Sequence, residues 1–151
     1  FNDNCLRMTA NAKNKEGFGP REGILRPGAK LDEYMGMAKI DLATGEMTRI
    51  HTQAAPGNGS ALVTGGDLLF WGDMNRRFRA FDADNGKVLW EMPVGGIIQT
   101  STISYAVNGR QYIAIFTGDA QSGTAGPLRV ATSVRPPRAH NAIYVFALPQ
   151  Q

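Results

Sequence analysis

The sequence contains a single cysteine, Cys5, so no disulfide can form within the chain. A lone cysteine is most often a small buried apolar residue, and a bridge to another chain is the alternative. Two histidines and one cysteine that lie far apart in the sequence do not make the ligand cluster of a transition-metal site. The sequence therefore assigns no metal-ligating residue.

Long apolar runs and a strong charge of one sign are missing as well. No apolar segment approaches the ~20 residues that a membrane-spanning helix needs, so no membrane span is expected. Residues 1–4 lack the basic start and the apolar core of a signal peptide. The formal net charge is +3, from 16 basic and 13 acidic side chains, and this balance argues against a nucleic-acid partner.

Two local clusters of basic residues have two interpretations. The first is solvated surface charge, and the second is a docking patch for an acidic partner protein. The clusters comprise Arg76, Arg77 and Arg79, and Arg129, Arg135, Arg138 and His140.

Turn-forming residues, in contrast, are abundant. The 151 residues include 18 glycines and 8 prolines, which is the supply that many turns between short strands require. Strand-like segments recur at short intervals, and no segment longer than a turn has the 3.6-residue periodicity of a helix, so we expect an all-β fold with few helices. We predict irregular chain at residues 1–30 and 118–140. The predicted strands are residues 37–42, 46–51, 61–64, 68–72, 77–81, 87–91, 101–107, 111–116 and 143–148.

Two of these predicted strands carry a specific prediction about burial. Ala38, Ile40 and Leu42 alternate with Met37, Lys39 and Asp41, which would place an apolar set on one face of the strand. Residues 68–72 form a continuous apolar run, as expected of a strand that is buried on both faces.

A repeat is the most informative feature of the chain. Residues 80–90, AFDADNGKVLW, read as a strand, a turn that begins at an aspartate, a glycine, and a second strand that carries a tryptophan. A second copy lies at residues 39–46, KIDLATGE, and both the aspartates and the glycines of the two copies are 41 positions apart. A repeat of about forty residues with this content is typical of a β-propeller, with one blade per repeat. The chain holds too few repeats to close a ring, so we expect it to be part of something larger.

Each residue type in this motif suits a physical role at its position. Ala80 is small where a large group must lie flat, and the Asp82 carboxylate can accept hydrogen bonds from turn amides. Gly86 permits a positive φ, and Trp90 supplies a large apolar area with one N–H donor. We interpret the motif as the element that fastens one blade to the next, without a catalytic role.

The motif resembles the tryptophan-docking motif of the quinoprotein alcohol dehydrogenases, the propeller enzymes that use pyrroloquinoline quinone (PQQ). The resemblance extends in order across roughly residues 36–149 and concerns the C-terminal part of the methanol and ethanol dehydrogenases; Asn2-x-x-Cys5 resembles a segment just upstream. The further matching segments are GGDLLF at 65–70, GII at 96–98, NGRQYIA at 108–114 and VFALP at 145–149.

This resemblance implies an architecture. The chain would form part of an eight-bladed β-propeller and supply about two to three blades of four-stranded antiparallel sheets. Residues 1–35 would be an irregular connecting segment over the propeller face. Residues 36–151 would be C-terminal blades that include the ring-closing last strand.

The resemblance also implies cofactor-binding residues. Asn2 corresponds to a family asparagine that contacts the quinone. Asn58 takes the place of a family tryptophan next to the cofactor, although a plain turn residue is the alternative interpretation of this position. A family Gly-Gly-Trp segment would fall at residues 120–122, which makes Gln121 and Ser122 the remaining candidates and leaves a more polar or more open pocket.

The catalytic base and the metal ligands of the family lie upstream of the matched region. No catalytic or metal-binding residue is therefore expected in this chain, although the family chemistry requires a calcium or lanthanide ion with oxygen ligands. We expect a larger N-terminal chain as a partner, an alcohol or sugar as substrate, a cytochrome c as electron acceptor, and a periplasmic location. The hypothesis is a C-terminal chain or small subunit of a quinoprotein dehydrogenase; the alternative is a non-catalytic propeller scaffold for protein contacts.

Overall fold

The computed structural model describes residues 1–10, 18–118, 121–131, 133–137 and 139–147. Strands dominate these residues, and the helices among them are one α-helix and one 3-10 helix. The elements are β1 (Asn4–Ala10), β2 (Phe18–Leu25), η1 (Leu31–Glu33), β3 (Met35–Ile40), β4 (Met47–Gln53), β5 (Leu62–Val63), β6 (Leu68–Gly72), β7 (Arg77–Asp82), β8 (Val88–Pro93), β9 (Ile103–Val107), β10 (Arg110–Thr117), α1 (Gln121–Val130) and β11 (Ala142–Ala147).

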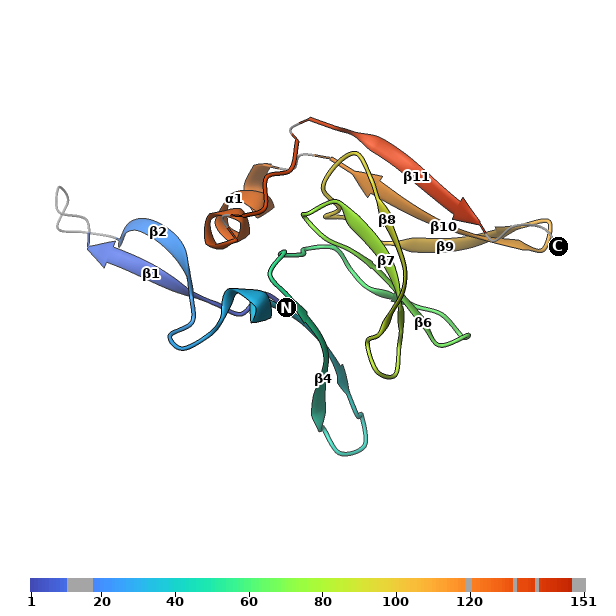
Figure 1. The fold of residues 1–151 in the computed structure, drawn as a ribbon, viewed down its shortest axis with the longest axis horizontal. Helices are drawn as coiled ribbons and strands as arrows, with labels where there is room; N and C mark the ends of the chain where they lie inside the picture. Colours follow the sequence, from blue (N-terminus) through green and yellow to red (C-terminus); the bar gives the residue numbers. More distant parts are fainter. Residues whose placement is uncertain (11–17, 119–120, 132, 138, 148–151) are drawn as a thin grey trace.

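The strands form four antiparallel sheets that follow one another along the chain (Figure 1). In each sheet, neighbours in space are also neighbours in sequence, as in a meander. Most of these neighbours are joined by short turns, because antiparallel strands need only a hairpin, whereas a long connection that contains α1 joins β10 to β11. The sheets are β1–β2, β3–β4, β5–β6–β7–β8 and β9–β10–β11.

The last three sheets pack face to face in sequence order. Met35 and Met37 of β3 are buried against Leu69, Trp71 and Phe81 of the four-stranded sheet. The opposite face of that sheet packs on β10 and β11, so β6 is covered on both faces, as residues 68–72 predict. A stack of short antiparallel sheets is the arrangement of neighbouring propeller blades, and the all-β prediction is confirmed.

Phe78 is the centre of the second interface. It has no solvent exposure, and its ring lies 5.2 Å from Phe146 of β11 and 6.0 Å from Trp90 of β8, between ring centroids. Trp90 meets Phe146 edge to face at 5.4 Å. Such pairs add about 0.5–1.5 kcal/mol each beyond their buried area, so this cluster joins the two sheets.

The repeated turns have the local structure that the sequence predicts. The Asp82 carboxylate accepts hydrogen bonds from the backbone N–H groups of Asp84 and Asn85, at 2.9 and 3.2 Å. Asp41 accepts the equivalent bonds in the first copy. Gly45 and Gly86 have φ values of +75° and +74°, so both copies close with a left-handed glycine.

Gly86 also makes the contact between neighbouring repeats. A Cβ atom at this position would lie 2.0 Å from the carbonyl oxygen of Ile50 in β4, so the turn of one sheet rests directly on the preceding sheet. Lys39 of β3 forms an ion pair with Asp84 of the same turn. Together with the Trp90–Phe146 contact, these interactions connect each sheet to the next one.

The turn carboxylates predict a pH dependence of stability. The N–H donors of Thr44 and Ala43 lower the pKa of Asp41 below its usual 3.8, and those of Asp84 and Asn85 do so for Asp82. Because both folded-state pKa values are lowered, the contribution is complete above the unfolded-state value of 3.8 and is lost as the pH falls through the folded-state values.

Replacing both aspartates, Asp41→Asn and Asp82→Asn, is expected to flatten this acid dependence. The amide oxygen still accepts turn hydrogen bonds, but it does not titrate. Thermal unfolding at pH values from 7 down to 3 checks the prediction. A double variant that loses stability as steeply as the parent protein below pH 4 would show that these carboxylates do not contribute.

Two segments predicted to be irregular contain regular structure. Residues 4–10 and 18–25 form the β1–β2 hairpin, so the prediction for residues 1–30 is wrong over these strands. Gly19, Pro20 and Gly23 interrupt β2 and hide its strand signal. The antiparallel hydrogen bonds between β1 and β2 keep this segment extended in spite of these residues.

The second such segment is α1, which replaces the predicted irregular chain at residues 121–130. Its sequence, QSGTAGPLRV, contains two glycines and Pro127, all poor helix formers. Leu128 and Val130 pack with Leu25 of β2 and with Tyr34, so tertiary contacts stabilise a helix that local propensity disfavours.

The predicted apolar face of β3 is also corrected. Met35 and Met37 are the buried residues, whereas Ile40 is 58% exposed and Leu42, in the following turn, is 97% exposed. The pairing of β3 with β4 shifts register between Met37 and Ala38, which breaks the simple alternation of faces.

The connections divide the last three sheets into two ends. At the turn end, short turns join the strands, at residues 41–46, 64–67, 83–87 and 108–109. At the loop end, the longer connections gather near the N-terminus and α1 (Figure 1). The loop end comprises residues 1–3, 54–61, 73–76, 94–102, 118 and 139–141. Neither described helix has the length or apolar character of a membrane-spanning helix.

Candidate functional site

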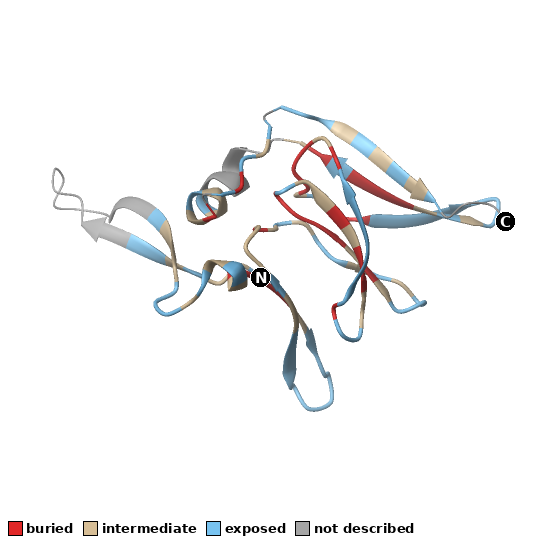
Figure 2. Ribbon diagram, in the orientation of Figure 1, coloured by how far each residue is buried: buried red, intermediate tan, exposed pale blue. Residues whose placement is uncertain are grey.

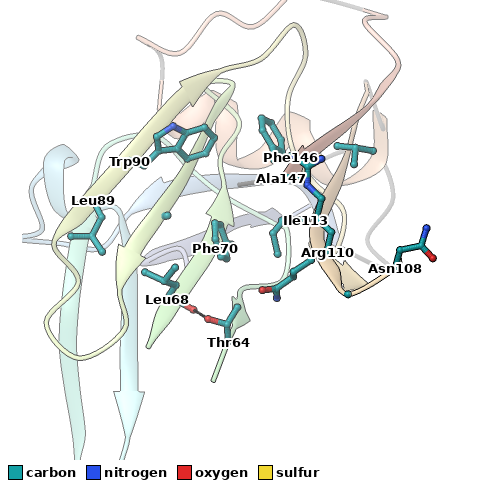
Figure 3. A pocket seen from close by; sticks show the side chains of 14 residues that line it. Thr64, Leu68, Phe70, Leu89, Trp90, Asn108, Arg110, Ile113, Phe146 and Ala147 are labelled. Carbon is teal, nitrogen blue, oxygen red and sulfur yellow. Dashed lines mark hydrogen bonds between the residues drawn. The ribbon is translucent and has the colours of Figure 1, made fainter. Parts of the chain in front are cut away.

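An apolar cleft of about 980 Å³ lies between the four-stranded sheet and the β9–β11 sheet, toward the turn end. Figure 3 shows Phe70, Trp90, Ile113 and Phe146 converging on it. Among the described residues that line it, Arg110 is the only charged one, and none is a carboxylate, a histidine or a cysteine. The described lining therefore offers no carboxylate, imidazole or thiol for acid–base chemistry or for a transition metal, and neither Asn2 nor Asn58 lines the cleft.

The loop end contains the predicted residues Asn2 and Asn58, and here the structure brings distant segments together. Asn2 pairs with Met35 at the start of β3. Its side-chain Nδ2 donates to the Gly57 carbonyl at 3.2 Å, and its Oδ1 accepts from the Gly57 N–H at 3.3 Å. This pair of bonds connects residues that are 55 positions apart and holds the loop that carries Asn58.

The indole ring of Trp71 packs against the same loop. A Cβ atom at Gly57 would lie 1.8 Å from the indole ring, so the backbone of Gly57 lies flat on Trp71. The indole Nε1 donates to the Gly59 carbonyl at 3.1 Å, and Trp71 is only 3% exposed. Gly57 and Gly59 are thus fixed on a rigid aromatic surface, and Asn58 between them is exposed.

The next connection closes the other side of the loop. A Cβ atom at Gly59 would lie 2.6 Å from the Thr100 carbonyl oxygen, so the two backbones touch. The hydroxyl groups of Ser60 and Ser101 lie 3.3 Å apart. The Pro56–Gly59 loop is therefore enclosed by Asn2, Trp71 and the 99–101 segment, an arrangement that can hold a ligand-binding loop in one conformation.

A buried polar network lies behind the loop. Asp73 has no solvent exposure and forms an ion pair with Arg79, at 2.7 Å from Nη1 to Oδ2. Gln53 donates to Asp73 at 3.0 Å and to the Ala55 carbonyl at 2.7 Å. The Arg77 backbone N–H completes the set of donors to Asp73, at 3.0 Å.

An apolar cluster lies beside the network. Tyr34 has no solvent exposure and packs with Ala55, Leu128 and Val134. Burial raises the pKa of the Tyr34 hydroxyl above its usual 10.0, so this hydroxyl stays neutral. The cluster brings the end of α1 to the start of the 54–61 loop.

The four predicted site residues have different outcomes. The structure brings Asn2 to the loop of Asn58. The backbones of Gln121 and Ser122 open α1, but their side chains lie outside the described residues. Whether the four residues bind a cofactor stays a prediction.

Sequence reasoning missed Trp71, Gln53 and Asp73. It placed Arg79 in a basic surface cluster, whereas the Arg79 side chain is only 13% exposed and pairs with Asp73 and Glu91. Trp71 has the pattern of a core strand residue, and the floor of a loop cannot be inferred from that pattern. An available signal was Asp73, an acidic residue directly after the apolar run 68–72 and before alternating arginines. Within the described residues, no group of three or more histidine, cysteine, aspartate or glutamate side chains could hold a metal ion.

Comparison with known proteins gives consistent matches. The PQQ family described as "Glucose/ethanol/alcohol dehydrogenase, beta-propeller domain" matches residues 30–113. The quinoprotein alcohol dehydrogenase PedH of Pseudomonas putida is 31% identical over 146 residues, which cover 90% of this chain and 24% of that protein. The quinoprotein ethanol dehydrogenase of Pseudomonas aeruginosa is 32% identical over 122 residues, which cover 78% of this chain and 19% of that protein.

A shorter match and two solved structures agree with these. The 1-butanol dehydrogenase (cytochrome c) of Thauera butanivorans is 38% identical over 94 residues, or 62% of this chain and 13% of that protein. A europium-containing methanol dehydrogenase superposes with a TM-score of 0.73 at 24% identity, over 97% of this chain and 30% of that one, and so supports the fold alone. The quinohemoprotein alcohol dehydrogenase ADHIIG from Pseudomonas putida HK5 has a TM-score of 0.54 at 27% identity, over 76% of this chain and 16% of that one.

The chain spans less than a quarter of the length of each of these three curated relatives. The fold is that of a partial β-propeller, as the repeat predicts. The expected resemblance to quinoprotein alcohol dehydrogenases is confirmed. Because the family match covers more than half of its residues, the chain belongs to the glucose/ethanol/alcohol dehydrogenase β-propeller family.

Proposed function

We propose that this chain is a section of a PQQ-dependent alcohol dehydrogenase, in which it supplies propeller blades and one wall of the quinone pocket. The observation that carries the proposal is the enclosed Pro56–Gly59 loop at the loop end, together with family membership. Loops held by a rigid sheet scaffold are the usual place of binding residues.

The residues at the loop end fit an acceptor-rich ligand such as PQQ, which carries carboxylate and quinone oxygens. A carboxamide nitrogen has two N–H bonds, and within the described part of the chain Gly57 uses one of those of Asn2. The exposed side chain of Asn58 lies on the same loop. Asn2 and Asn58, with Gln121 and Ser122 at the start of α1, are the residues that we propose hold the quinone.

The chemistry that a bound quinone supplies is the acceptance of two electrons from an alcohol. In this proposal the chain orients the ligand and excludes water. Holding the metal ion is not assigned to it, because the residues described at the loop end include no metal-binding cluster. The catalytic base and the ligands for calcium or a lanthanide ion would come from polypeptide outside residues 1–151.

Exposed apolar surface supports a larger propeller. One face of the β9–β11 sheet carries a set of side chains that are 41–64% exposed, which is unusual for a complete domain. Figure 2 shows buried residues concentrated on β6, β7 and β10, while β9 and β11 are intermediate or exposed. The exposed set is Ile103, Tyr105, Val107, Phe116, Ile143 and Val145.

The remaining features of the proposal concern the substrate, the partner and the location. We propose an alcohol or a sugar as substrate, a larger chain of the same enzyme as partner, and a periplasmic location. Three relatives are named as dehydrogenase subunits, and another carries cytochrome c in its name, which supports a multi-chain assembly and a cytochrome acceptor.

Titration of the full-length protein with PQQ tests the proposal. In the presence of calcium or a lanthanide ion, we expect saturable binding with one quinone per protein, followed by alcohol-dependent reduction of an artificial electron acceptor. No saturable binding with either ion would contradict the proposal and favour the non-catalytic scaffold.

A further inference from the structure

The buried network behind the Pro56–Gly59 loop is hydrogen-bonded to the start of that loop at two points, Ala55 and Pro56. Asp73 lies at the end of β6 with no solvent exposure, and its carboxylate receives one backbone and two side-chain hydrogen bonds. A buried carboxylate is tolerated only when its acceptor sites are occupied in this way. The network therefore has one well-defined geometry.

Gln53 transmits this geometry to the loop. Its Nε2 donates both to Asp73 and to the Ala55 carbonyl, and its Oε1 accepts from Arg79 Nη1 at 3.2 Å. The amide is thus fixed at both atoms. Ala55 directly precedes the Pro56–Gly59 loop, so the position of Gln53 sets where the loop begins.

The backbone beside Asp73 makes a second connection. The Met74 N–H donates to the Pro56 carbonyl at 2.9 Å, and the Ile98 N–H donates to the Asp73 carbonyl at 3.1 Å. The turn after β6 therefore holds the 54–61 loop and the 94–102 segment at once. Asn58 lies on the first of these two segments and is exposed.

We propose that Asp73, Arg79 and Gln53 are positioning residues that preform the quinone-facing Pro56–Gly59 loop. They touch neither ligand nor reacting atoms, and they act through Ala55 and Pro56. The role in quinone binding rests on the proposed function, whereas the role in holding the loop rests on the described contacts alone.

The same network also joins two sheets, so a purely structural role is the competing explanation. Arg79 has a second acidic partner, Glu91, at 2.5 Å. Removal of the Asp73 charge therefore leaves Arg79 paired, and the Asp73→Asn protein is expected to fold. In that variant the new amide donor faces the donors of Gln53 and Arg79, which disturbs the loop connection specifically.

Hydrogen exchange and PQQ titration of the full-length protein distinguish the two explanations. In Asp73→Asn, we expect the amide hydrogens of Gly57 and Met74 to exchange about tenfold faster in the protein without quinone, and the Kd for PQQ to rise about tenfold. Gln53→Met removes the connection to Ala55 and the hydrogen bonds of Gln53 to Asp73 and Arg79, while the Asp73–Arg79 ion pair stays, and it should act in the same direction. This variant keeps the test available if Asp73→Asn fails to fold.

Asp84→Asn is the matched control. It makes the same chemical change in the Lys39–Asp84 ion pair, which joins the same two sheets at the turn end. Unchanged loop exchange and an unchanged Kd in Asp73→Asn and Gln53→Met would overturn the proposal, even if the melting temperature falls. If the parent protein binds no PQQ, the proposed function fails, while the exchange rates still decide whether the network holds the loop.

Discussion

Gly57→Ala is expected to raise the Kd for PQQ of the full-length protein about a hundredfold. A methyl group at this position would lie 1.8 Å from the Trp71 ring, far inside van der Waals contact. Trp71 is buried, so the loop must move and take Asn58 with it. A displacement of about 1 Å in a binding site is enough for an effect of this size.

Gly65→Ala is the control for this variant. A Cβ atom at Gly65, in the turn between β5 and β6, would meet no atom within 4 Å. Parallel PQQ titrations of the two variants should give a weakened Gly57→Ala and an unaffected Gly65→Ala. Equal affinities in both variants would show that the loop on Trp71 does not shape the quinone pocket.

Gly86→Ala is expected to lower the free energy of unfolding by about 3 kcal/mol or more. The left-handed φ of +74° costs an alanine about 1–2 kcal/mol, and its Cβ would meet the Ile50 carbonyl at 2.0 Å. A backbone oxygen cannot rotate away as a flexible side chain can. The turn must therefore retreat from β4, which loosens the contact between the two repeats.

Gly45→Ala provides the matched comparison, because Gly45 occupies the equivalent position of the first repeat. Its φ is +75°, but no atom lies within 4 Å of a Cβ there, so only the backbone strain of about 1–2 kcal/mol applies. Thermal unfolding of both variants in the full-length protein measures the difference. If the two alanines prove equally costly, the contact of Gly86 with Ile50 contributes nothing to stability.

The sequence predicted the repeated sheets well because their signals are local. The run 68–72 is a buried strand, and Asp82 and Gly86 form the turn that their residue types require. Hairpin turns and alternation depend on neighbours a few positions away, so one sequence is enough to read them.

The parts that were missed depend on distant contacts. The β1–β2 hairpin forms in spite of Gly19 and Pro20, and α1 forms in spite of Pro127. Their stability comes from pairing and from the cluster around Tyr34. Local propensity carries no information on such contacts.

The candidate site shows the same division. Asn2 and Asn58 were selected through family resemblance, and the structure adds the bonds from Asn2 to Gly57. Gln53 and Asp73 meet although they are 20 positions apart and lie on different sheets. No spacing rule indicates such a pair, so the network behind the loop could be found only from the fold.

An experimental structure of the full-length protein with PQQ bound tests the central claim most directly. We predict that polypeptide outside residues 1–151 covers the exposed face of the β9–β11 sheet, and that the quinone lies against the Pro56–Gly59 loop within hydrogen-bond distance of Asn2. A quinone bound elsewhere, with that sheet face open to solvent, would contradict the account.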